Sequence, residues 1–369
     1  MSKSLRVALL GYGTVGRSVH KILANLPGIE VVAILRRPGK AQGELMTDSF
    51  ESILNDTSVD CLVDVLPGAH PSYEYIQAGL NAKKTVVTAN KAAVALDLPG
   101  LSALAQKNGV QFFYEATCGG GVPVIHNLCR TVEVDDIKRV KGILNGTCNF
   151  ILDVMETQGR DFADVLKEAQ ALGYAEADPT TDISGEDVRN KAIIASSIAY
   201  QTSVVKDFPV SGLVGLSAEV LENLRAEGAT CRLMLLSKKE GDAYALGVAP
   251  LKVSQSSLFA NVRQNFNAVE LDSEYLGRFQ LTGQGAGGDP TALAVVQDCV
   301  SVAKSLPLGT PRFDRTLTYT PTLLMGNAYF VDEVLRDVSL EEATKEAQKR
   351  QAFFVWEEAS DAAMKTWWL

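Results

Sequence analysis

The sequence has few histidines and no closely paired cysteines. The three histidines, His20, His70 and His126, are too dispersed along the chain to indicate a zinc site, so a bound metal would need oxygen ligands. The six cysteines are scattered without a CxxC pair. In a chain of 369 residues, this distribution favours reduced thiols over a disulfide framework, and we therefore expect a cytoplasmic protein.

The sequence also lacks a long apolar run and a basic stripe. No segment reaches the roughly 18 to 20 apolar residues that a helix needs to cross a bilayer. The first residues lead directly into a predicted strand, without the apolar core and cleavage site of a signal peptide. The formal net charge of -9 argues against nucleic acid as a partner. We expect neither a nucleic-acid nor a membrane partner, and the length allows two domains.

Strands alternate with helices in the first third of the chain. Leu5–Leu10 is almost continuously apolar, as is typical of a parallel strand buried on both faces. A glycine-rich segment and a helical stretch to about Leu26 follow it. Further strands are predicted at 31–35, 61–66, 85–88 and 110–114, with a helix at 101–108. The alternation predicts an α/β fold, with a Rossmann-type doubly wound parallel sheet over residues 1–134.

The pattern changes after about Val134. Residues 135–289 combine helices with β-rich segments, and they are predicted to form an inserted α+β domain for substrate binding and dimerisation. The helical stretch at 290–308 is expected to return to the first domain, with Pro290 near its start. Residues 309–369 predict a helical tail. Its apolar segments, 352–356 and 367–369, are expected to dock either on a partner subunit or on the chain's own surface.

A glycine motif follows the first strand. Gly11 permits a tight turn, Gly13 lets a pyrophosphate approach the backbone, and Gly16 lets the helix and strand pack closely. Thr14 and Val15 begin the helix, whose free N–H groups and positive dipole end favour phosphate. A glycine-rich turn also arises for packing alone, but its position between a buried strand and a helix favours dinucleotide binding.

The second strand ends with two arginines instead of a carboxylate. An NAD site usually has Asp or Glu here, to accept from the ribose 2′-OH. A guanidinium instead pairs with a 2′-phosphate. Arg36 and Arg37 therefore predict NADP as the preferred cofactor, with NAD still possible; the alternative is that both are solvated loop residues.

Several carboxylates and one lysine lie within the segment 173–191. Asp187 and Lys191 are four residues apart on one helical face, so they could form an ordinary surface ion pair. Asp187 could also be only a capping residue, because Ser184 precedes it by three positions. The apolar stretch after Lys191 favours a buried helix, where an unpaired lysine would be costly. A lysine in such a place can act as a general acid.

Two more charged positions are candidates for the same chemistry. Glu176 and Asp178 lie on an irregular segment that could supply anionic partners to a substrate ammonium, although such loops are often only solvated. Lys91 follows the strand at 85–88 and so falls at the carboxyl end of a strand, where open α/β sheets bind ligands. Its alternative is an exposed lysine that begins a helix.

Six segments form a specific combination of motifs. They are GYGTVG at 11–16, VVTANKA at 86–92, YEATCGGGVPVI at 114–125, GILNGTCNFIL at 142–152, GYAEADPTTDISGEDVRNK at 173–191 and GQGAGGDPTALAVV at 283–296. In this order and spacing they resemble the homoserine dehydrogenase family, whose members interconvert aspartate semialdehyde and homoserine. The resemblance covers roughly Leu5 to Leu308.

The resemblance implies a role for each matching residue. Lys191 would be the acid/base at the substrate oxygen, and Lys91 would share the proton transfer or the electrostatic work beside the nicotinamide. The predicted substrate-binding residues are Glu176 and Asp187, which would hold the amino group, together with Asp182. The nicotinamide half of the cofactor would contact Lys91, Gly173 and Gly285.

The resemblance also implies a structural sodium ion. Main-chain carbonyls would hold it at Glu115, Cys118, Gly120 and Val122, although a glycine run can be a flexible turn without a ligand. The segment 64–68 departs from the family's usual glycine-rich turn, which makes cofactor contacts there less certain to transfer. The residues after Leu308 lack the βαββαβ alternation of the ACT domain found in many relatives, so we expect no ACT domain.

The predicted function is that of an NADP-preferring homoserine dehydrogenase in threonine and methionine biosynthesis, acting as a homodimer or homotetramer. The alternatives are another amino-acid dehydrogenase, of the aspartate or diaminopimelate type, and a non-catalytic NADP-binding sensor.

Overall fold

The computed structural model describes residues 4–175, 177–309 and 311–359, and they form two compact units. The first unit combines three segments of the chain: Met1–Asp136, Ile193–Ser203 and Gly283–Arg315. The second unit combines the other three: Ile137–Ala192, Val204–Thr282 and Thr316–Leu369. The chain therefore passes between the units five times.

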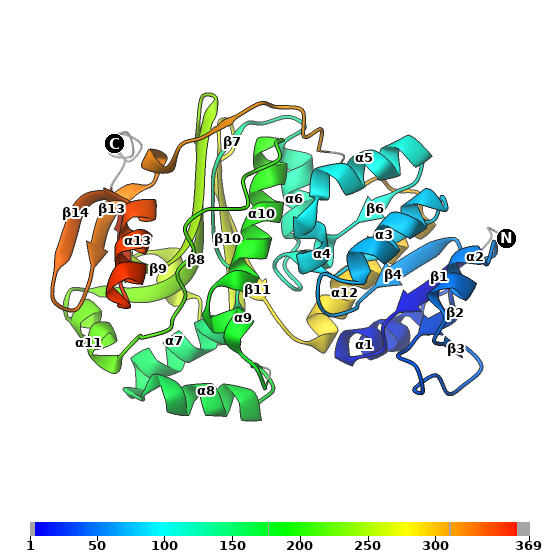
Figure 1. The fold of residues 1–369 in the computed structure, drawn as a ribbon, viewed down its shortest axis with the longest axis horizontal. Coiled ribbons are helices and arrows are strands. Elements are labelled where there is room, and N and C mark those ends of the chain that lie inside the picture. The colour runs from blue at the N-terminus through cyan, green and yellow to red at the C-terminus, as the bar shows by residue number, and fades with distance from the viewer. Residues whose placement is uncertain (1–3, 176, 310, 360–369) are drawn as a thin grey trace. The chain divides into compact units, whose positions relative to one another are not determined.

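A six-stranded parallel sheet forms the centre of the first unit (Figure 1). Its strands are β1 (Leu5–Leu10), β2 (Ile29–Leu35), β3 (Met46–Thr47), β4 (Cys61–Asp64), β5 (Thr85–Thr88) and β6 (Phe112–Phe113). They lie in the order β3-β2-β1-β4-β5-β6, and each neighbouring pair is parallel. The order reverses direction between β1 and β4. The loops that follow these two strands therefore frame the position where open α/β sheets bind ligands.

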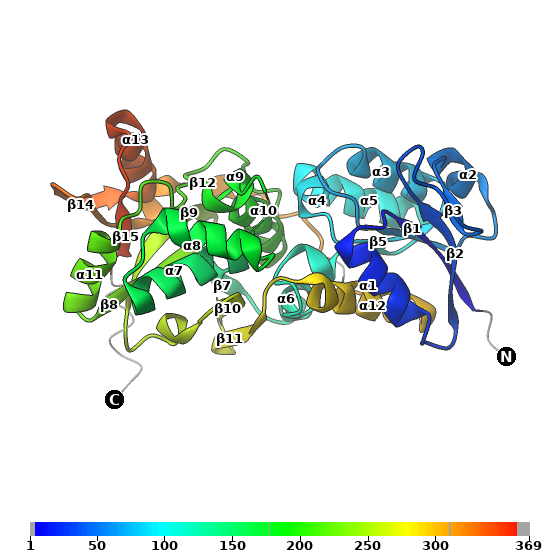
Figure 2. The same ribbon diagram turned by 90° about the horizontal axis from the view of Figure 1, so that it is seen from below.

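Helices cover both faces of this sheet (Figure 2). They are α1 (Thr14–Leu23), α2 (Phe50–Asn55), α3 (Ser72–Asn81), α4 (Lys91–Leu96), α5 (Leu98–Asn108), α6 (Val124–Thr131) and α12 (Gly288–Ala303), with the short 3-10 helix η1 (Glu115–Thr117). Helices α1 and α12 pack together on one face, and α3 packs with α5 on the other. This layering confirms the predicted doubly wound fold. It requires strands without a polar face, and β1 and β4 are accordingly apolar apart from Arg6 and Asp64.

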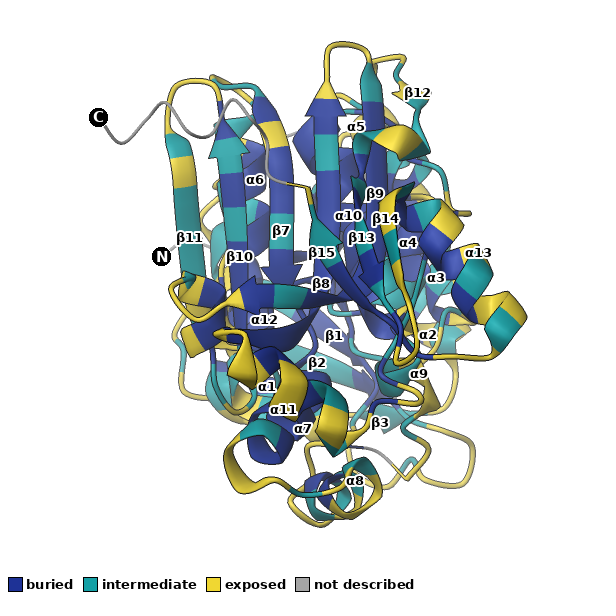
Figure 3. Cartoon of the chain, turned by 90° about the vertical axis from the view of Figure 1, so that its left-hand side faces the viewer, coloured by how far each residue is buried: buried dark blue, intermediate teal, exposed yellow. Residues whose placement is uncertain are grey.

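A nine-stranded mixed sheet forms the centre of the second unit. Its strands are β7 (Ile137–Ile143), β8 (Ala229–Glu240), β9 (Ala243–Ser254), β10 (Phe266–Ser273), β11 (Gly277–Gln284), β12 (Thr318–Tyr319), β13 (Met325–Tyr329), β14 (Val334–Ser339) and β15 (Val355–Glu358). The main order is β11-β10-β7-β8-β9-β15-β13-β14, and β12 pairs with β9. The long hairpin β8–β9 has a two-residue turn in which Gly241 has φ +55°. Figure 3 shows β8 mostly buried and β11, at one end of the order, much less so.

The helices of the second unit are mostly short. They are α7 (Gly146–Gln158), α8 (Phe162–Ala171), α9 (Thr180–Ile183), α11 (Ala218–Ala226) and α13 (Leu340–Arg350), with the 3-10 helices η2 (Leu258–Asn261) and η3 (Pro321–Leu323). Helix α10 (Glu186–Tyr200) begins in the second unit and continues into the first. Among the described residues, no helix is long and apolar enough to cross a membrane.

The prediction of a helical tail was wrong. Between residues 309 and 359 the chain forms β12, β13, β14 and β15 with one helix of 11 residues, α13. Residues from 316 onward belong to the second unit, where β15 pairs with β9 in parallel and with β13 antiparallel. Strands β13 to β15 are short and partly polar, so their pairing partners define them more than their own sequence does. The predicted absence of an ACT domain stays a prediction.

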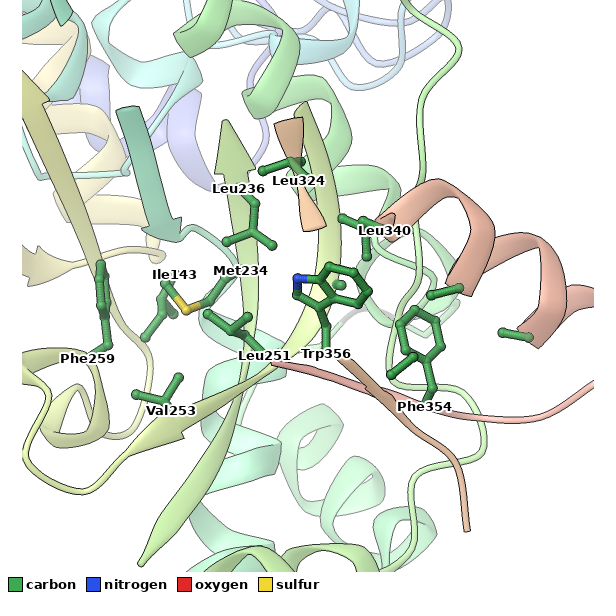
Figure 4. Packing of buried hydrophobic residues seen from close by; sticks show 14 of the residues in the cluster. Ile143, Met234, Leu236, Leu251, Val253, Phe259, Leu324, Leu340, Phe354 and Trp356 are labelled. Carbon is green, nitrogen blue, oxygen red and sulfur yellow. The ribbon is translucent and has the colours of Figure 1, made fainter. Parts of the chain in front are cut away.

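The tail contributes directly to the core of the second unit (Figure 4). Trp356 is fully buried against the sheet, in the same cluster as Met234 and Leu251. Phe354 and Leu340 extend this cluster toward α13. The expectation that the segment 352–356 docks on another surface is thereby met within the chain itself. The second predicted segment, 367–369, lies outside the described residues.

The unit boundaries differ from the predicted domain boundaries at several points. The first unit ends at Asp136 and resumes at Gly283, and it also takes back Ile193–Ser203 from the predicted insertion. Residues 309–315 belong to the first unit. The tail is therefore divided between the units and does not form a third part.

Candidate functional site

The glycine loop after β1 is packed as the motif predicts. Gly11 has φ +105°, and a side chain there would meet the Val65 carbonyl oxygen at 3.1 Å. A Cβ atom on Gly16 would lie 2.5 Å from the Gly11 carbonyl oxygen, so α1 packs directly on the loop. By contrast, a Cβ atom on Gly13 would meet no described atom within 4 Å. The loop therefore leaves space at Gly13, where a phosphate group would approach.

The N-terminus of α1 is suited to an anion. Gly13 is its N-cap, and among the described residues no side chain caps the helix. The first turn, which begins with Thr14 and Val15, contains no acidic residue. The N–H groups of a first helical turn have no partner within the helix, and they carry its positive dipole end. The predicted residues Gly11, Gly13, Thr14, Val15 and Gly16 thus lie at a helix N-terminus of the kind that suits a phosphate group.

The two arginines at the end of β2 differ in their surroundings. Arg36 is half-buried, and its guanidinium carbon lies 5.6 Å from the ring centroid of Tyr12, inside the glycine motif. The Tyr12 hydroxyl in turn forms a hydrogen bond of 2.8 Å with Nδ1 of His20 on α1. Arg37 is exposed. Of the two predicted phosphate ligands, Arg36 is therefore the one that the glycine loop holds in place.

The segment after β4 is organised by a buried carboxyl group. Asp64 accepts hydrogen bonds from Ser72, from Thr88 Oγ1 at 2.8 Å and from the Leu66 N–H at 3.1 Å. Burial raises the pKa of Asp64, while these three hydrogen bonds oppose the rise. The carboxyl group therefore joins the ends of β4 and β5.

Lys91 is the first residue of α4, directly after β5. Asn90 caps that helix through the Ala93 N–H at 3.0 Å. The side-chain amide of Asn90 donates to the carbonyl oxygens of Leu66 and Gly68, at 2.9 and 2.6 Å. Lys91 is half-buried at the carboxyl end of the sheet, as predicted, and a capped helix fixes its backbone.

The loop predicted to bind sodium packs against the glycine-rich segment before α12. Gly120 has φ +65°, and a Cβ atom there would lie 2.4 Å from the Gly285 carbonyl oxygen. The Gly121 N–H donates to the Gln284 carbonyl at 3.1 Å. Cys118 and Val122 are buried in the same loop. The structure thus joins Gly285 to the loop, and only glycine at position 120 allows this approach.

The Glu115 side chain forms hydrogen bonds within the first unit. Its carboxylate accepts from the N–H groups of Ile125 and His126, at 3.0 and 2.7 Å, and also pairs with the His126 ring. Nε2 of His126 lies 3.7 Å from Oδ1 of Asp298 on α12. The hydrogen bond with Glu115 raises the pKa of His126. Burial, with the negative charge of Glu115, raises the pKa of Asp298 to about 8.

His126 joins two buried carboxyl groups, those of Glu115 and Asp298. Asp298 and His126 carry no pattern in the sequence that distinguishes them. Their contacts with Glu115 span 183 and 11 positions of the chain.

In the second unit, Lys191 and Asp187 form a buried ion pair on α10. Nζ of Lys191 lies 2.7 Å from Oδ2 of Asp187 and donates to the Leu144 carbonyl at 2.5 Å. Lys191 is 7% exposed and Asp187 is 3% exposed. This burial rules out the alternative of a solvated surface pair. The carbonyl of Leu144, directly after β7, supplies a second acceptor for the ammonium group.

Asn145 links the ion pair to a second carboxylate. Its side-chain amide donates to Oδ2 of Asp187 at 2.9 Å and to Oδ1 of Asp182 at 2.8 Å. Its Oδ1 accepts from the Cys148 N–H at 2.7 Å and so caps α7. Asp182, Asp187 and Lys191 thus lie together as predicted, around a residue that no prediction had singled out. Its position before Gly-Thr at a helix start indicates a cap, but not these two long-range contacts.

The remaining residues of this segment have different roles. Helix α10 begins at Glu186, whose N–H donates to Ser184 Oγ at 3.4 Å, and the Asp187 carboxylate contacts Asn145 and Lys191. Asp178 is exposed and accepts from the N–H and hydroxyl of Thr180. Glu176 lies outside the described residues. Gly173, with φ +77°, follows the end of α8 in the second unit.

Side-chain metal ligands do not cluster in the described part of the chain. Within residues 4–175, 177–309 and 311–359, no group of three His, Cys, Asp or Glu side chains is placed to hold an ion. A cation site in this region would have to use main-chain oxygens.

Two family models match the chain. One, described as the NAD binding domain of homoserine dehydrogenase, matches residues 11–115, and one described as homoserine dehydrogenase matches residues 123–300. A homoserine dehydrogenase of Corynebacterium glutamicum is 38% identical over 319 residues, which cover 81% of this chain and 72% of that protein. One of Bacillus subtilis is 33% identical, covering 83% of this chain and 75% of that protein. The chain belongs to the homoserine dehydrogenase family.

Solved structures of homoserine dehydrogenases share the fold. The enzyme of Thiobacillus denitrificans aligns with a TM-score of 0.86 at 29% identity, covering 96% of this chain and 98% of that one. A hyperthermophilic archaeal homoserine dehydrogenase, solved in complex with NADPH, aligns with a TM-score of 0.71 at 27% identity. That alignment covers 83% of this chain and 99% of that one. A nicotinamide cofactor therefore suits the first unit, which carries the matching dinucleotide-binding region.

Proposed function

We propose that this member of the homoserine dehydrogenase family catalyses the NAD(P)H-dependent interconversion of L-aspartate 4-semialdehyde and L-homoserine. The buried ion pair between Lys191 and Asp187 carries the proposal, because an ammonium group in that position can exchange a proton with a substrate oxygen. The uncapped N-terminus of α1 supports the binding of the cofactor.

The residues of the second unit account for the handling of the substrate. Lys191 donates a proton to the oxygen of the aldehyde as it is reduced, and takes that proton back in the reverse direction. Asp187 and Asp182, with Glu176 as in the family, bind the ammonium group of the amino acid. When bound, the nicotinamide supplies the hydride. Holding the reacting groups in position accounts for several kcal/mol of barrier lowering, on the order of 7 in favourable cases.

The test is a spectrophotometric assay of homoserine oxidation. We expect the purified chain to reduce NADP in the presence of L-homoserine, and to show little turnover with aspartate or diaminopimelate. Robust turnover of either of those compounds, with none of homoserine, would overturn the proposal in favour of another amino-acid dehydrogenase. Tight dinucleotide binding without turnover of any of them would indicate a sensor.

The proposed cofactor preference is NADP over NAD. Its support is the position of Arg36, which lies over the Tyr12 ring beside the phosphate-binding loop, where a guanidinium would pair with a 2′-phosphate. Replacing Arg36 by Ala should raise the KM for NADP by about tenfold or more, the scale of a lost charged hydrogen bond, and leave the KM for NAD nearly unchanged. Replacing the exposed Arg37 tests the alternative assignment. A larger effect at position 37 would move the role there.

A sodium ion is proposed at the carbonyls of Glu115, Cys118, Gly120 and Val122. The chemistry of the loop fits: the positive φ at Gly120 turns successive carbonyls within one short segment. The Val122 and Glu115 carbonyls each accept one backbone N–H, at 2.8 and 3.3 Å, and a carbonyl has a second lone pair for a cation. Exchange of sodium for choline should lower the melting temperature and restore it on adding sodium back. An unchanged melting temperature argues against the ion.

The proposed assembly is a homodimer or homotetramer in the cytoplasm. The second sheet ends in β11 and β14, which offer strand edges to a further copy, and the six cysteines are buried free thiols, as suits a reducing compartment. Light scattering on the purified chain measures the assembly; a monomer at micromolar concentration would contradict it. Threonine and methionine biosynthesis is the proposed pathway.

A further inference from the structure

The structure assigns a positioning role to Asn145: we propose that its side-chain amide holds the two carboxylates that bind the ammonium group of the substrate. The inference rests on the proposed function. It concerns a residue that lies behind the substrate-binding groups and acts through them.

The side chain of Asn145 is buried and fully hydrogen-bonded. It is 4% exposed and lies between the end of β7 and the start of α7. Its oxygen accepts from the Cys148 N–H, and its nitrogen donates to Asp182 and Asp187. Three of its side-chain hydrogen bonds thus point in set directions, which fixes both the rotamer and the orientation of the amide.

The Asn145 amide places a hydrogen-bond donor between two carboxylates. Asp182 and Asp187 carry like charges, and Asp187 is buried, where such charges repel strongly. Lys191 contacts Oδ2 of Asp187, the same oxygen that accepts from Asn145. The amide bridges this oxygen to Oδ1 of Asp182. One residue therefore holds both carboxylates in place.

A variant that keeps the capping oxygen but loses the donor amide separates the capping role of Asn145 from its positioning role. Serine caps helices about as well as asparagine, so Asn145→Ser keeps an oxygen for α7 and removes the double donor. Asn145→Asp also keeps the cap but replaces the donor by a third carboxylate beside Asp182 and Asp187. The matched control is Asn149→Ser, on the same helix. Its buried amide donates to the carbonyls of Val262, Gln264 and Phe266, away from the two carboxylates.

The readouts are the KM for homoserine, the KM for NADP, kcat and the melting temperature. Asn145→Ser should raise the homoserine KM by about tenfold, the scale of a lost hydrogen bond to a charged group, with kcat and the NADP KM within about threefold. Asn145→Asp should raise the homoserine KM further. Asn149→Ser should lower the melting temperature and leave the homoserine KM unchanged.

The possible outcomes separate this inference from the proposed function. If the wild-type chain does not turn over homoserine, the proposed function fails. If it does, and both Asn145 variants keep the wild-type homoserine KM, the positioning role is wrong. The role is also wrong if Asn145→Ser and Asn149→Ser change the two KM values and the melting temperature in the same way. Should Asn145→Ser not fold, the same comparison is made with Asn145→Asp.

Discussion

At the scale of single residues, Lys191 combines burial with a specific set of acceptors. Its ammonium group contacts the Leu144 carbonyl and the Asp187 carboxylate. Lys191→Met keeps most of the side-chain volume and removes the ammonium group that would donate the proton. We expect kcat for homoserine oxidation to fall by about 10² to 10⁴-fold, the contribution typical of general acid–base catalysis. The affinity for NADPH, measured by fluorescence titration, should change little.

The control for this variant is Lys167→Met on α8. The Lys167 side chain is 76% exposed and pairs only loosely with Asp164, at 3.6 Å. Its kcat should equal that of the wild type. An equal loss of NADPH affinity and of kcat in Lys191→Met would mean that Lys191 supports the structure and does not transfer the proton.

Asp64 gives a prediction about pH. Burial raises its pKa above the ordinary value of 3.8, so the folded chain keeps a proton that the unfolded chain has lost. The stability that Asp64 contributes is therefore present at acid pH and is lost as the pH rises through its raised pKa. Asn at this position stays neutral at every pH. Relative to the wild type, the urea midpoint of Asp64→Asn should increase as the pH rises above the ordinary pKa of 3.8, whereas a difference that does not change with pH would contradict the raised pKa.

At the scale of elements, the turn between β1 and α1 allows two glycines to be compared. A Cβ atom on Gly16 would meet the Gly11 carbonyl at 2.5 Å, so Gly16→Ala forces α1 away from the loop. Overpacking of this kind costs about 1 to 3 kcal/mol, which thermal unfolding measures. Gly13→Ala meets no described atom within 4 Å and should fold normally. Its methyl group would instead lie where the phosphates approach, and it should raise the KM for NADP.

The opposite pattern would refute this division of roles. If Gly13→Ala lowers the melting temperature and Gly16→Ala does not, then the packing of the loop has been assigned to the wrong glycine.

Local chemistry explains which elements the sequence predicts well. The glycine motif lies between a buried strand and a helix, so all of its information is contained within about 20 residues. Lys191 and Asp187 are likewise neighbours on one helix. Asn145 meets its two carboxylates across 37 and 42 positions, and only the folded chain shows this contact. The sequence also does not identify β8, because its apolar run Leu233–Leu236 is short, and such runs do not distinguish a strand from a buried helix.

At the scale of the whole molecule, the tail completes the second unit. Trp356 is fully buried, and Gly326 of β13 packs so closely on its ring that a Cβ atom there would lie 2.8 Å from Cζ2. Trp356→Ala should destabilise the protein by about 3 to 5 kcal/mol, as typical for a buried aromatic residue. Thermal unfolding followed by far-UV circular dichroism measures the loss. The control is Val331→Ala in the same tail, where the residue is 78% exposed and its loss should have little effect.

A Trp356→Ala variant as stable as the wild type would show that the Trp356 ring contributes little to the core of the second unit. A second set of contacts also holds β15 in the second unit. Glu358 of β15 forms ion pairs with Arg139 and Lys141 of β7, which lies on the other side of the hairpin β8–β9. The sequence cannot predict how this tail joins the sheet, since β15 pairs with β9 across about 100 positions of the chain, and Glu358 pairs with Arg139 across 219.

The five passages of the chain between the units have a consequence for synthesis. The segment Gly283–Arg315, which includes α12, completes the first unit, and it leaves the ribosome long after Asp136. At about 5 to 20 residues per second, the β1–β6 sheet waits roughly 10 to 30 s for the helix that packs on α1. A nascent chain of this protein therefore leaves the apolar side of α1 that faces α12 uncovered for nearly half of its translation, and a ribosome-associated chaperone could bind there during that time.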